Sequence, residues 1–504
     1  MAETLTPDIC VIGAGSGGLS VAAAAAAFGV PVVLIEKGKM GGDCLNYGCV
    51  PSKALLAAAK HAAEQKRATP FGLKLPRLDV DFARVHAHVH QVIAAIAPND
   101  SKERFTGLGV HVIEGAARFA DARTVVAGGT EIKARRFVIA TGSRAALPAI
   151  EGLAETPHLT NETVFALKRC PGHLIVIGAG PVGLELAQAF RRLGAQVTVL
   201  EAVKPLAHDD PECAAVVLDR LRHEGVTIRT GVTVARVAGN ESKVTVVIND
   251  MNEETIEGSD LLVAAGRRPN IEGLELEKAG IKYTDRGVTV GKGLKSSNKR
   301  VYAIGDVAGG PQFTHAANYH AGIVVRSALF RLPARASNES LPWVTFTEPE
   351  LAHVGLTEAQ ARARHRTIRV LRWPYHENDR AQAERPHPRL HHRRRAGGRA
   401  DHGLDPRTVT QSQYSSHDRN CGAVSDAFRN RQTCRNHLFF AKFDQSKTAA
   451  PDRLSAPLRV SYTLADCMRV FAPAVGGFER AFAPVHSPSK TGANALRDRQ
   501  KAAR

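Results

Sequence analysis

The stretch Asp8–Lys37, DICVIGAGSGGLSVAAAAAAFGVPVVLIEK, decides the fold of the N-terminal part of this chain. A short apolar run, a glycine-rich turn, an alanine-rich segment and a second apolar run predict a strand, a helix and a parallel strand. Gly13 permits the sharp turn, Gly15 lets a pyrophosphate approach the backbone, and Gly18 permits close helix–strand packing. Glu36 closes the second strand, where a carboxylate can bind a ribose diol. The stretch therefore predicts a dinucleotide site.

The same pattern returns in GHLIVIGAGPVGLELAQAFRRLGAQVTVLEA, which carries Gly178, Gly180, Gly183 and Glu201. In both copies the first glycine and the acid are 23 positions apart. The chain is therefore predicted to contain two dinucleotide-binding units. At the second unit we favour NADH over NADPH, because the carboxylate of Glu201 would repel a 2′-phosphate.

Between the two units lies MGGDCLNYGCVPSKALL, Met40–Leu56, in which four residues separate Cys44 from Cys49 behind a Gly-Gly turn. A thiol at a helix N-terminus has a lowered pKa, because the helix dipole stabilises the thiolate. The pattern favours a redox pair. The alternative is a passive disulfide or two core thiols.

These segments resemble the pyridine nucleotide–disulfide oxidoreductases, a family that includes dihydrolipoamide dehydrogenase, glutathione reductase and mercuric reductase. The matching pieces follow the family order and cover about residues 8–385: GAGSGG, GGDCLNYGCVPSKALL, ATGS, GAGPVGLE, AAGRRPN and AIGDV. The resemblance implies FAD in the first unit and NADH or NADPH in the second. It also implies an α/β fold of two Rossmann-like domains with a C-terminal α+β dimerisation domain, which is incomplete here.

The resemblance also implies a domain order. An FAD-binding domain spans residues 1–150 and continues in 275–340, and an NAD(P)-binding domain spans 151–274. The dimerisation domain begins at 341 and extends to 385. Residues 386–504 are expected to be an out-of-frame, disordered tail.

Residue roles follow from the resemblance as well. Cys49 is expected to be the flavin-facing, charge-transfer thiol and Cys44 the interchange thiol that meets the substrate. Lys53 and Glu185 resemble the ion pair beside the flavin where hydride arrives. Asp306 of AIGDV is expected to hold the ribityl chain of the flavin.

Two further groups of residues have more modest expected roles. Thr141 and Gly142, and Gly266 with Arg267, resemble the turns where the chain passes between the two domains, although ordinary strand ends are the alternative. In GGPQFTHAANYHAG, which is expected to open a helix near the flavin, we expect His315 and His320 to be structural rather than catalytic.

Composition limits the class of protein. The chain has 504 residues and eight cysteines, of which only Cys44 and Cys49 form a close pair. This is not the pattern of a secreted disulfide framework, so we expect a reducing, cytoplasmic setting. The uncharged stretch 9–35 could suggest a membrane span, but its glycines and Pro31 favour strand, turn, helix and strand. We expect neither a membrane segment nor a resident metal site.

The net charge of +18 raises the possibility of nucleic-acid binding. The excess is concentrated in residues 386–504, which hold 21 of the 67 Lys and Arg but only 9 of the 49 Asp and Glu. The most basic run of this segment, residues 389–399, is not interleaved with Phe, Tyr or Trp, and the segment matches no nucleic-acid-binding module. We therefore expect no nucleic-acid partner.

The tail begins at PHPRLHHRRRAGGRADHG, where hydrophobic periodicity ends. One interpretation is a disordered basic tail. We favour a shift of reading frame: moving the codons of residues 417–440 forward by one base permits a sequence that resembles the dimer-interface helix of the family. The resemblance implies a homodimer, whereas the lost interface favours monomers or aggregates.

The leading hypothesis is an FAD-dependent NAD(P)H oxidoreductase. It would pass electrons through FAD to the Cys44–Cys49 disulfide and then to a small-molecule acceptor. The motifs most resemble the mercuric reductase branch, and thiolates bind soft metals, so Hg(II) is the first candidate. The chain lacks the His-Pro-Thr-x-x-Glu pattern that serves thiol substrates in this family. A dihydrolipoyl dehydrogenase-like reductase and an inactive FAD-binding remnant remain as alternatives.

Overall fold

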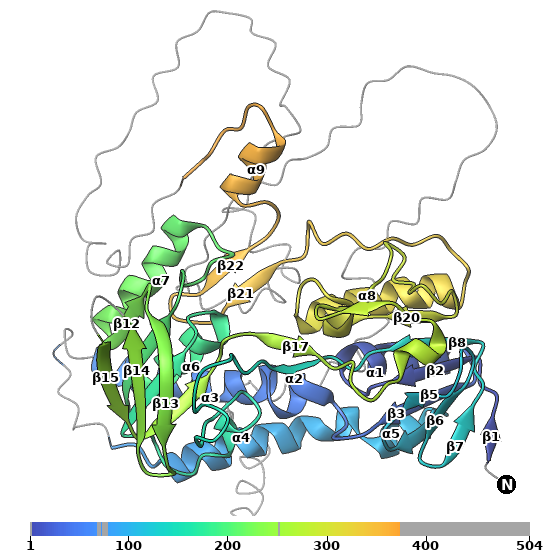
Figure 1. Ribbon diagram of the computed structural model, residues 1–504, viewed down its shortest axis with the longest axis horizontal. Coiled ribbons are helices and arrows are strands. Elements are labelled where there is room, and N and C mark those ends of the chain that lie inside the picture. Colours follow the sequence, from blue (N-terminus) through green and yellow to red (C-terminus); the bar gives the residue numbers. More distant parts are fainter. Residues whose placement is uncertain (1–2, 68–71, 73–78, 250–252, 373–504) are drawn as a thin grey trace, which may run out of the picture.

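The computed structural model describes residues 3–67, 72, 79–249 and 253–372. Two α/β lobes lie side by side, and a smaller segment near the end of the described chain lies above them (Figure 1). The predicted fold class is confirmed, with two Rossmann-like units and the beginning of a third domain.

The first lobe is built on a parallel five-stranded sheet of order β20-β8-β2-β3-β4. Its strands are β2 (Ile9–Ile12), β3 (Val32–Glu36), β4 (His111–Glu114), β8 (Arg136–Ile139) and β20 (Val301–Ala303). All four residues of β2 are buried, as expected for a central strand with both faces covered. On one face α1 (Ser16–Ala27) packs against α8 (Thr314–Ala328), where the small side chains of α1 allow close contact.

The second lobe repeats this plan with a parallel sheet of order β12-β11-β10-β16. Its elements are β10 (His173–Ile177), α6 (Pro181–Arg192), β11 (Gln196–Glu201), α7 (Pro211–His223), β12 (Val226–Thr230) and β16 (Asp260–Val263). Ile9 pairs with Val32 in the first lobe, and His173 pairs with Gln196 in the second. In each pair the two residues are 23 positions apart, so the repeat in the sequence is also a repeat in how the strands are paired.

Smaller sheets flank the two lobes. An antiparallel sheet on the second lobe contains β13 (Thr233–Gly239), β14 (Val244–Asn249) and β15 (Glu253–Gly258). The first lobe carries a sheet of order β1-β7-β6-β5, made of β1 (Thr4–Leu5), β7 (Thr130–Ile132), β6 (Val125–Ala127) and β5 (Arg118–Phe119). A short helix, α5 (Lys102–Gly107), precedes β4.

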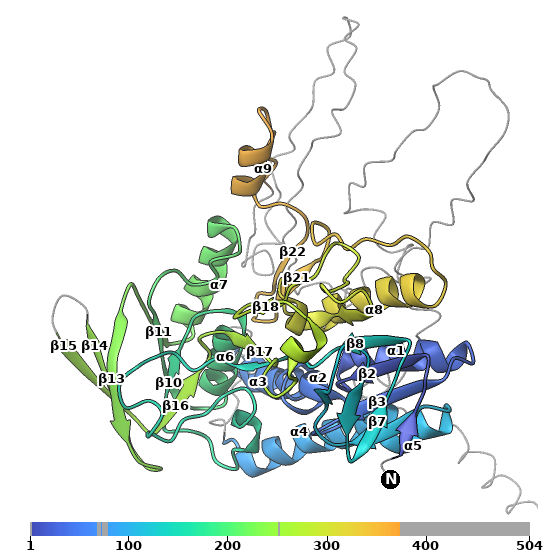
Figure 2. The same cartoon turned by 45° about the vertical axis from the view of Figure 1, so that its right-hand side comes forward.

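Helices from the N-terminal part of the chain join the lobes. After the short α2 (Gly42–Asn46), α3 (Cys49–Arg67) packs on both α4 (Phe82–Ile96) and α6 of the second lobe. The rings of Phe82 and Phe190 stack at 6.0 Å within this shared core. An antiparallel ribbon of β9 (Ser143–Ala145) and β17 (Arg267–Pro269) also runs between the lobes (Figure 2).

The last described segment forms a hairpin and a helix: β21 (Trp343–Thr345), β22 (Leu351–His353) and α9 (Glu358–Arg364). Each strand of this hairpin has three residues, which are too few to show an alternating pattern in the sequence. A capping box between Thr357 and Gln360 starts α9. The tail 386–504 lies outside the described residues.

In the stretch 9–35, which lacks charged residues, the chain forms β2, the glycine turn, α1 and β3, as expected. Among the described residues, none of the helices has both the length and the apolar character that a bilayer crossing requires.

Candidate active site

One cavity of about 2370 Å³ lies between the lobes and contains almost all of the residues singled out from the sequence. The lining includes both glycine turns, the acids that end β3 and β11, both cysteines, Lys53, Glu185, Thr141, Gly142, Gly266 and Asp306. Gly18 and Gly183, for which a packing role was predicted, do not line it. The fold thus brings residues from distant parts of the sequence to one site.

The three glycines of the first turn have different steric surroundings, as the sequence predicted. Gly13 has φ +105°, and a Cβ there would lie 2.5 Å from the carbonyl oxygen of Ala140. A Cβ on Gly18 would lie 1.9 Å from the carbonyl oxygen of Gly13, which explains why α1 needs glycine at this position. At Gly15 the nearest atom to a Cβ is 3.9 Å away, so this backbone is open to the cavity.

The second turn has the same geometry. A Cβ on Gly178 would lie 2.6 Å from the carbonyl oxygen of Ala264, and one on Gly183 would lie 2.1 Å from that of Gly178. At Gly180 no atom lies within 4 Å of a Cβ. Each turn therefore leaves one glycine backbone accessible at a helix N-terminus, where a pyrophosphate would bind. The two cradles fit FAD and a nicotinamide dinucleotide.

The two acids also match in detail. Glu36 accepts hydrogen bonds from the backbone N–H groups of Ala14 (2.6 Å) and Gly38 (2.8 Å). Glu201 accepts from the equivalent groups of Ala179 (2.8 Å) and Val203 (3.0 Å). These bonds orient both carboxylates along the cavity wall, where a ribose would lie.

The two cysteines lie on separate helices and are present as free thiols. Cys44 belongs to α2, and Cys49 is the first residue of α3, so the prediction of a helix start is correct for Cys49. A hydrogen bond with Cys44 lowers the pKa of Cys49 to about 6, and Lys53 and Thr314 act in the same direction. The same hydrogen bond, together with burial, raises the pKa of Cys44. The pair therefore holds one thiolate and one thiol at neutral pH.

Lys53 and Glu185 form an ion pair, as expected, with Nζ and Oε2 2.9 Å apart. They are 132 positions apart in sequence and come from α3 and α6. Burial opposes the charge on Lys53, but Glu185 and the sulfur of Cys49 outweigh it and raise the Lys53 pKa. Lys53 thus presents a stable positive charge one helical turn from Cys49.

Asp306 belongs to a 3₁₀ turn, Gly305–Ala308, at the end of β20. Its Oδ2 accepts a hydrogen bond from the hydroxyl of Ser143 at 2.5 Å. Burial raises the pKa of Asp306, although Ser143 and Arg267 act against this. Arg267 also lies 3.1 Å from Asp43 and so joins the β9–β17 ribbon to α2.

The predicted inter-domain turns lie at the ends of this ribbon. The Thr141 hydroxyl donates to the carbonyl oxygen of Asn270 at 2.7 Å, and Gly142 has φ +67°. Gly266 has φ +124°, and its carbonyl oxygen accepts from the N–H of Ala146 at 3.0 Å.

Sequence reasoning missed Thr314. Its hydroxyl lies 3.3 Å from the sulfur of Cys49, although 265 positions separate them. The neighbouring histidines drew attention to this segment, and both make backbone hydrogen bonds. His320 is buried and accepts from the N–H of Gly305, while a ring nitrogen of His315 bonds to the carbonyl oxygen of Pro342 at 2.6 Å. A single Thr at the start of a helix does not predict a contact with a distant cysteine, so the sequence offered no way to find Thr314.

Comparison with protein families identifies two matches. Residues 7–321 match the family "Pyridine nucleotide-disulphide oxidoreductase", and residues 341–391 match its dimerisation domain. The second match is consistent with an interface domain that is only partly present.

Individual relatives point to the same family. The chain is 38% identical to a mercuric reductase of Bacillus cereus over 70% of its own length, but the match spans only 57% of that enzyme. It is 35% identical to a dihydrolipoyl dehydrogenase of Geobacillus stearothermophilus over 75% of this chain and 81% of that one. The Cu(II) complex of the HOCl-induced flavoprotein disulfide reductase RclA from Escherichia coli has a similar structure, with a TM-score of 0.63 and 30% identity. That likeness covers 70% of this chain and 79% of RclA.

Proposed function

Because the chain belongs to the pyridine nucleotide-disulphide oxidoreductase family, whose members bind FAD and use NAD(P)H, we propose that it is a cytoplasmic NADH-dependent reductase. Its Cys44–Cys49 pair would deliver electrons to a small thiophilic acceptor, for which we propose Hg(II). The observation that carries this proposal is the pairing of a low-pKa thiol with a protonated thiol beside the Lys53–Glu185 ion pair.

The residues of the site divide into two binding regions. The first glycine turn, Glu36 and Asp306 would hold FAD, and the second glycine turn with Glu201 would hold NADH. Bound FAD would supply the two-electron chemistry that links the nicotinamide to the disulfide. The ammonium of Lys53 stabilises the thiolate of Cys49. Glu185 fixes the position of that ammonium.

The chemistry of the two sulfurs suits a soft metal ion. Cys44 loses its proton when it binds Hg(II), and Cys49 binds as the thiolate. Hg(II) takes two electrons and leaves as Hg(0), while the sulfurs close to a disulfide. One NADH supplies the pair, so no further reductant is required. The relatives named mercuric reductases and the Cu(II) complex of RclA support a metal-ion acceptor.

The test uses the full chain loaded with FAD. NADH oxidation is followed with Hg(II) in excess thiol, with lipoamide, and with an artificial dye as acceptor. We expect Hg(II)-dependent turnover that Cys44→Ser and Cys49→Ser abolish. Cys170→Ser is the control, because Cys170 lies in the second lobe and its thiol bonds to the carbonyl oxygen of Leu193.

Three other outcomes have distinct meanings. Turnover with lipoamide but not with Hg(II) would favour a thiol–disulfide reductase. Dye reduction alone, together with a monomer in sedimentation, would indicate an FAD-binding remnant. Equal use of NADPH would contradict the role assigned to Glu201.

A further inference from the structure

Helix α6 carries three buried polar side chains on one face. Glu185 is 5% exposed, Gln188 is 1% and Arg192 is 6%. They are spaced three and four positions apart, which places them on one stripe of the helix. Buried polar groups cost free energy unless each finds a partner. All three find partners in the same short segment, residues 346–348.

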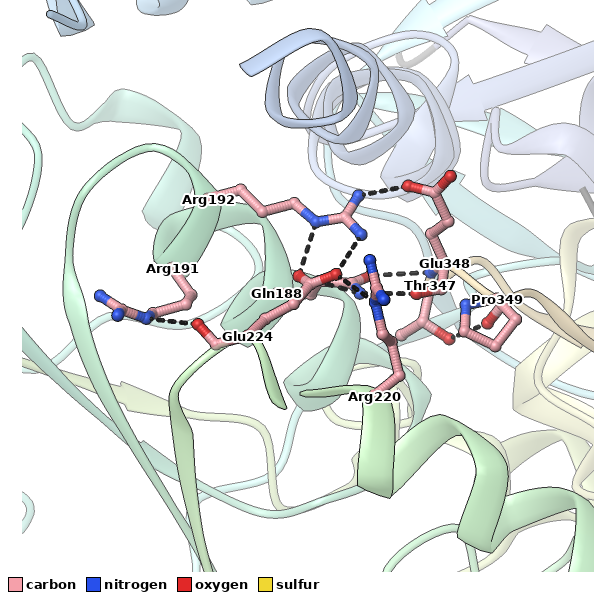
Figure 3. Close-up of polar contacts among 8 residues, drawn as sticks. All are labelled: Gln188, Arg191, Arg192, Arg220, Glu224, Thr347, Glu348 and Pro349. Atoms are coloured by element: carbon pink, nitrogen blue, oxygen red, sulfur yellow. Dashed lines mark hydrogen bonds and ion pairs between the residues drawn. The ribbon is translucent and has the colours of Figure 1, made fainter. Parts of the chain in front are cut away.

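The contacts between this stripe and the segment follow one another in order, and Figure 3 shows those of Gln188 and Arg192 with Glu348. The N–H of Phe346 donates to Oε1 of Glu185 at 2.9 Å. Gln188 engages both backbone groups of Glu348, accepting from its N–H at 2.8 Å and donating to its carbonyl oxygen at 2.9 Å. Nη1 of Arg192 donates to Oε2 of Glu348 at 2.8 Å. Residues 346–348 are thus bound to α6 through Glu185, Gln188 and Arg192.

At one end of the stripe, Arg192 is held by Glu224 as well as by Glu348. Glu224 accepts from Nε and Nη2 of Arg192 at 2.8 and 2.7 Å, and from Nε of Arg220 at 2.7 Å. Although burial opposes the charge, the two guanidinium groups lower the pKa of Glu224. Arg192 is therefore oriented by a carboxylate on each side (Figure 3).

At the other end of the stripe, Glu185 lies beside the redox centre. Phe346 contacts both members of the ion pair next to Cys49, because its N–H bonds to Glu185 and its ring lies 4.3 Å from Nζ of Lys53. A shift of Phe346 would therefore move the carboxylate and the ammonium together. By contrast, the two hydrogen bonds of Arg372 to Glu212 tie this region to the second lobe at a point away from the ion pair.

We propose that Gln188, Arg192 and Glu348 are positioning residues, which hold Phe346 so that Glu185 and Lys53 keep their place beside Cys49. This rests on the proposed disulfide reductase function. Under this proposal, residues 346–348 act on the Lys53–Glu185 ion pair from within the same chain. A purely architectural network would hold the segment but leave the reactivity of Cys49 unchanged.

The test measures the alkylation of Cys49 by iodoacetamide against pH in the chemically reduced protein, with the site identified by peptide mass spectrometry. Glu348→Ala removes one of the two carboxylates that accept from Arg192, and Gln188→Leu removes both contacts to the backbone of Glu348. We expect each to move the pH midpoint upward by about half a unit. The rate of NADH-driven flavin reduction should fall by roughly tenfold, because small misplacements at a reacting centre are costly.

Two variants serve as controls. Glu348→Gln keeps an oxygen that can accept from Arg192, so it should stay near the wild-type values. Arg372→Gln removes a tie that does not lead to Glu185, so its midpoint and rate should not change. If Glu348→Ala and Gln188→Leu lower only the thermal stability, the network is architectural and the proposal is wrong. If Gln188→Leu does not fold, Glu348→Ala decides. Failure of the proposed function looks different, since the wild type itself would then show neither a low midpoint for Cys49 nor reduction by NADH.

Discussion

The charge of Lys53 should set the pH at which Cys49 becomes reactive, and Lys53→Met tests this directly. Side chains four positions apart on a helix lie roughly 6 Å apart. At an effective dielectric constant of about 20, a unit charge at that distance contributes roughly 2.8 kcal/mol, or about two pKa units. The Lys53 side chain is 26% exposed, so solvent screening reduces this ceiling. We expect a rise of about one unit, from a pKa of about 6.

The direction follows from the chemistry of a thiol. The thiolate is populated above the pKa, so a higher pKa moves the alkylation profile to more alkaline pH. The measurement is the rate of iodoacetamide labelling of Cys49 across pH 5 to about 9, a range chosen to bracket both values. Because it requires only the reduced protein, the result does not depend on cofactor binding or turnover.

Lys60→Met is the matched control on the same helix. Lys60 follows Cys49 by eleven positions, or about 16 Å along the helix axis, which exceeds the Debye length at physiological salt. Its removal should leave the profile unchanged. An unchanged profile in Lys53→Met, or equal shifts in both variants, would refute the contribution of Lys53 to the low pKa of Cys49.

Three other predictions rest on single contacts, and a fourth rests on the sequence of the tail. Thr314→Val removes the hydroxyl 3.3 Å from the Cys49 sulfur, so its labelling profile should move upward by about half a unit, and Thr314→Ser should restore it. Gly183→Ala should lower the free energy of unfolding by about 1–3 kcal/mol or more in denaturant titrations, because its Cβ would meet the carbonyl oxygen of Gly178. Gly180→Ala is the matched variant at an open position, so it should keep the stability and raise the KM for NADH roughly tenfold. Arg192→Met removes the guanidinium that joins Glu224 and Glu348, so the free energy of unfolding should fall by about 3–5 kcal/mol at neutral pH. That loss should shrink in acid. Because folding lowers the pKa of Glu224, its ionised carboxylate stabilises the fold at pH values above the pKa of the unfolded chain, and this contribution disappears as the pH falls through the pKa of the folded protein. Sequencing the coding DNA across codons 383–387 should reveal a gained or lost base, and the repaired chain should sediment as a dimer; an intact frame would contradict the reading-frame hypothesis.

Much of the fold could be predicted because its signals are local. A parallel strand buried on both faces requires a continuous apolar run, and a nucleotide turn requires glycine where a Cβ would strike a carbonyl oxygen. Gly13 and Gly18 show this necessity directly. The 23-residue spacing reappears as strand register for the same reason, since one turn and one helix of fixed length join the paired strands. The short strand β22 carries no such signal, because three residues show no periodicity.

The sequence by itself therefore determined the two dinucleotide units and the cysteine pair. Resemblance to the family supplied the pairing of Lys53 with Glu185. Only the tertiary structure placed Thr314 beside Cys49 and Phe346 against Lys53, and only it joined Gln188 and Arg192 to Glu348. These contacts link residues more than a hundred positions apart, and their geometry depends on how α3, α6 and the hairpin pack together. Hydrophobic periodicity records which face of an element is buried, but not which distant side chain that face will meet.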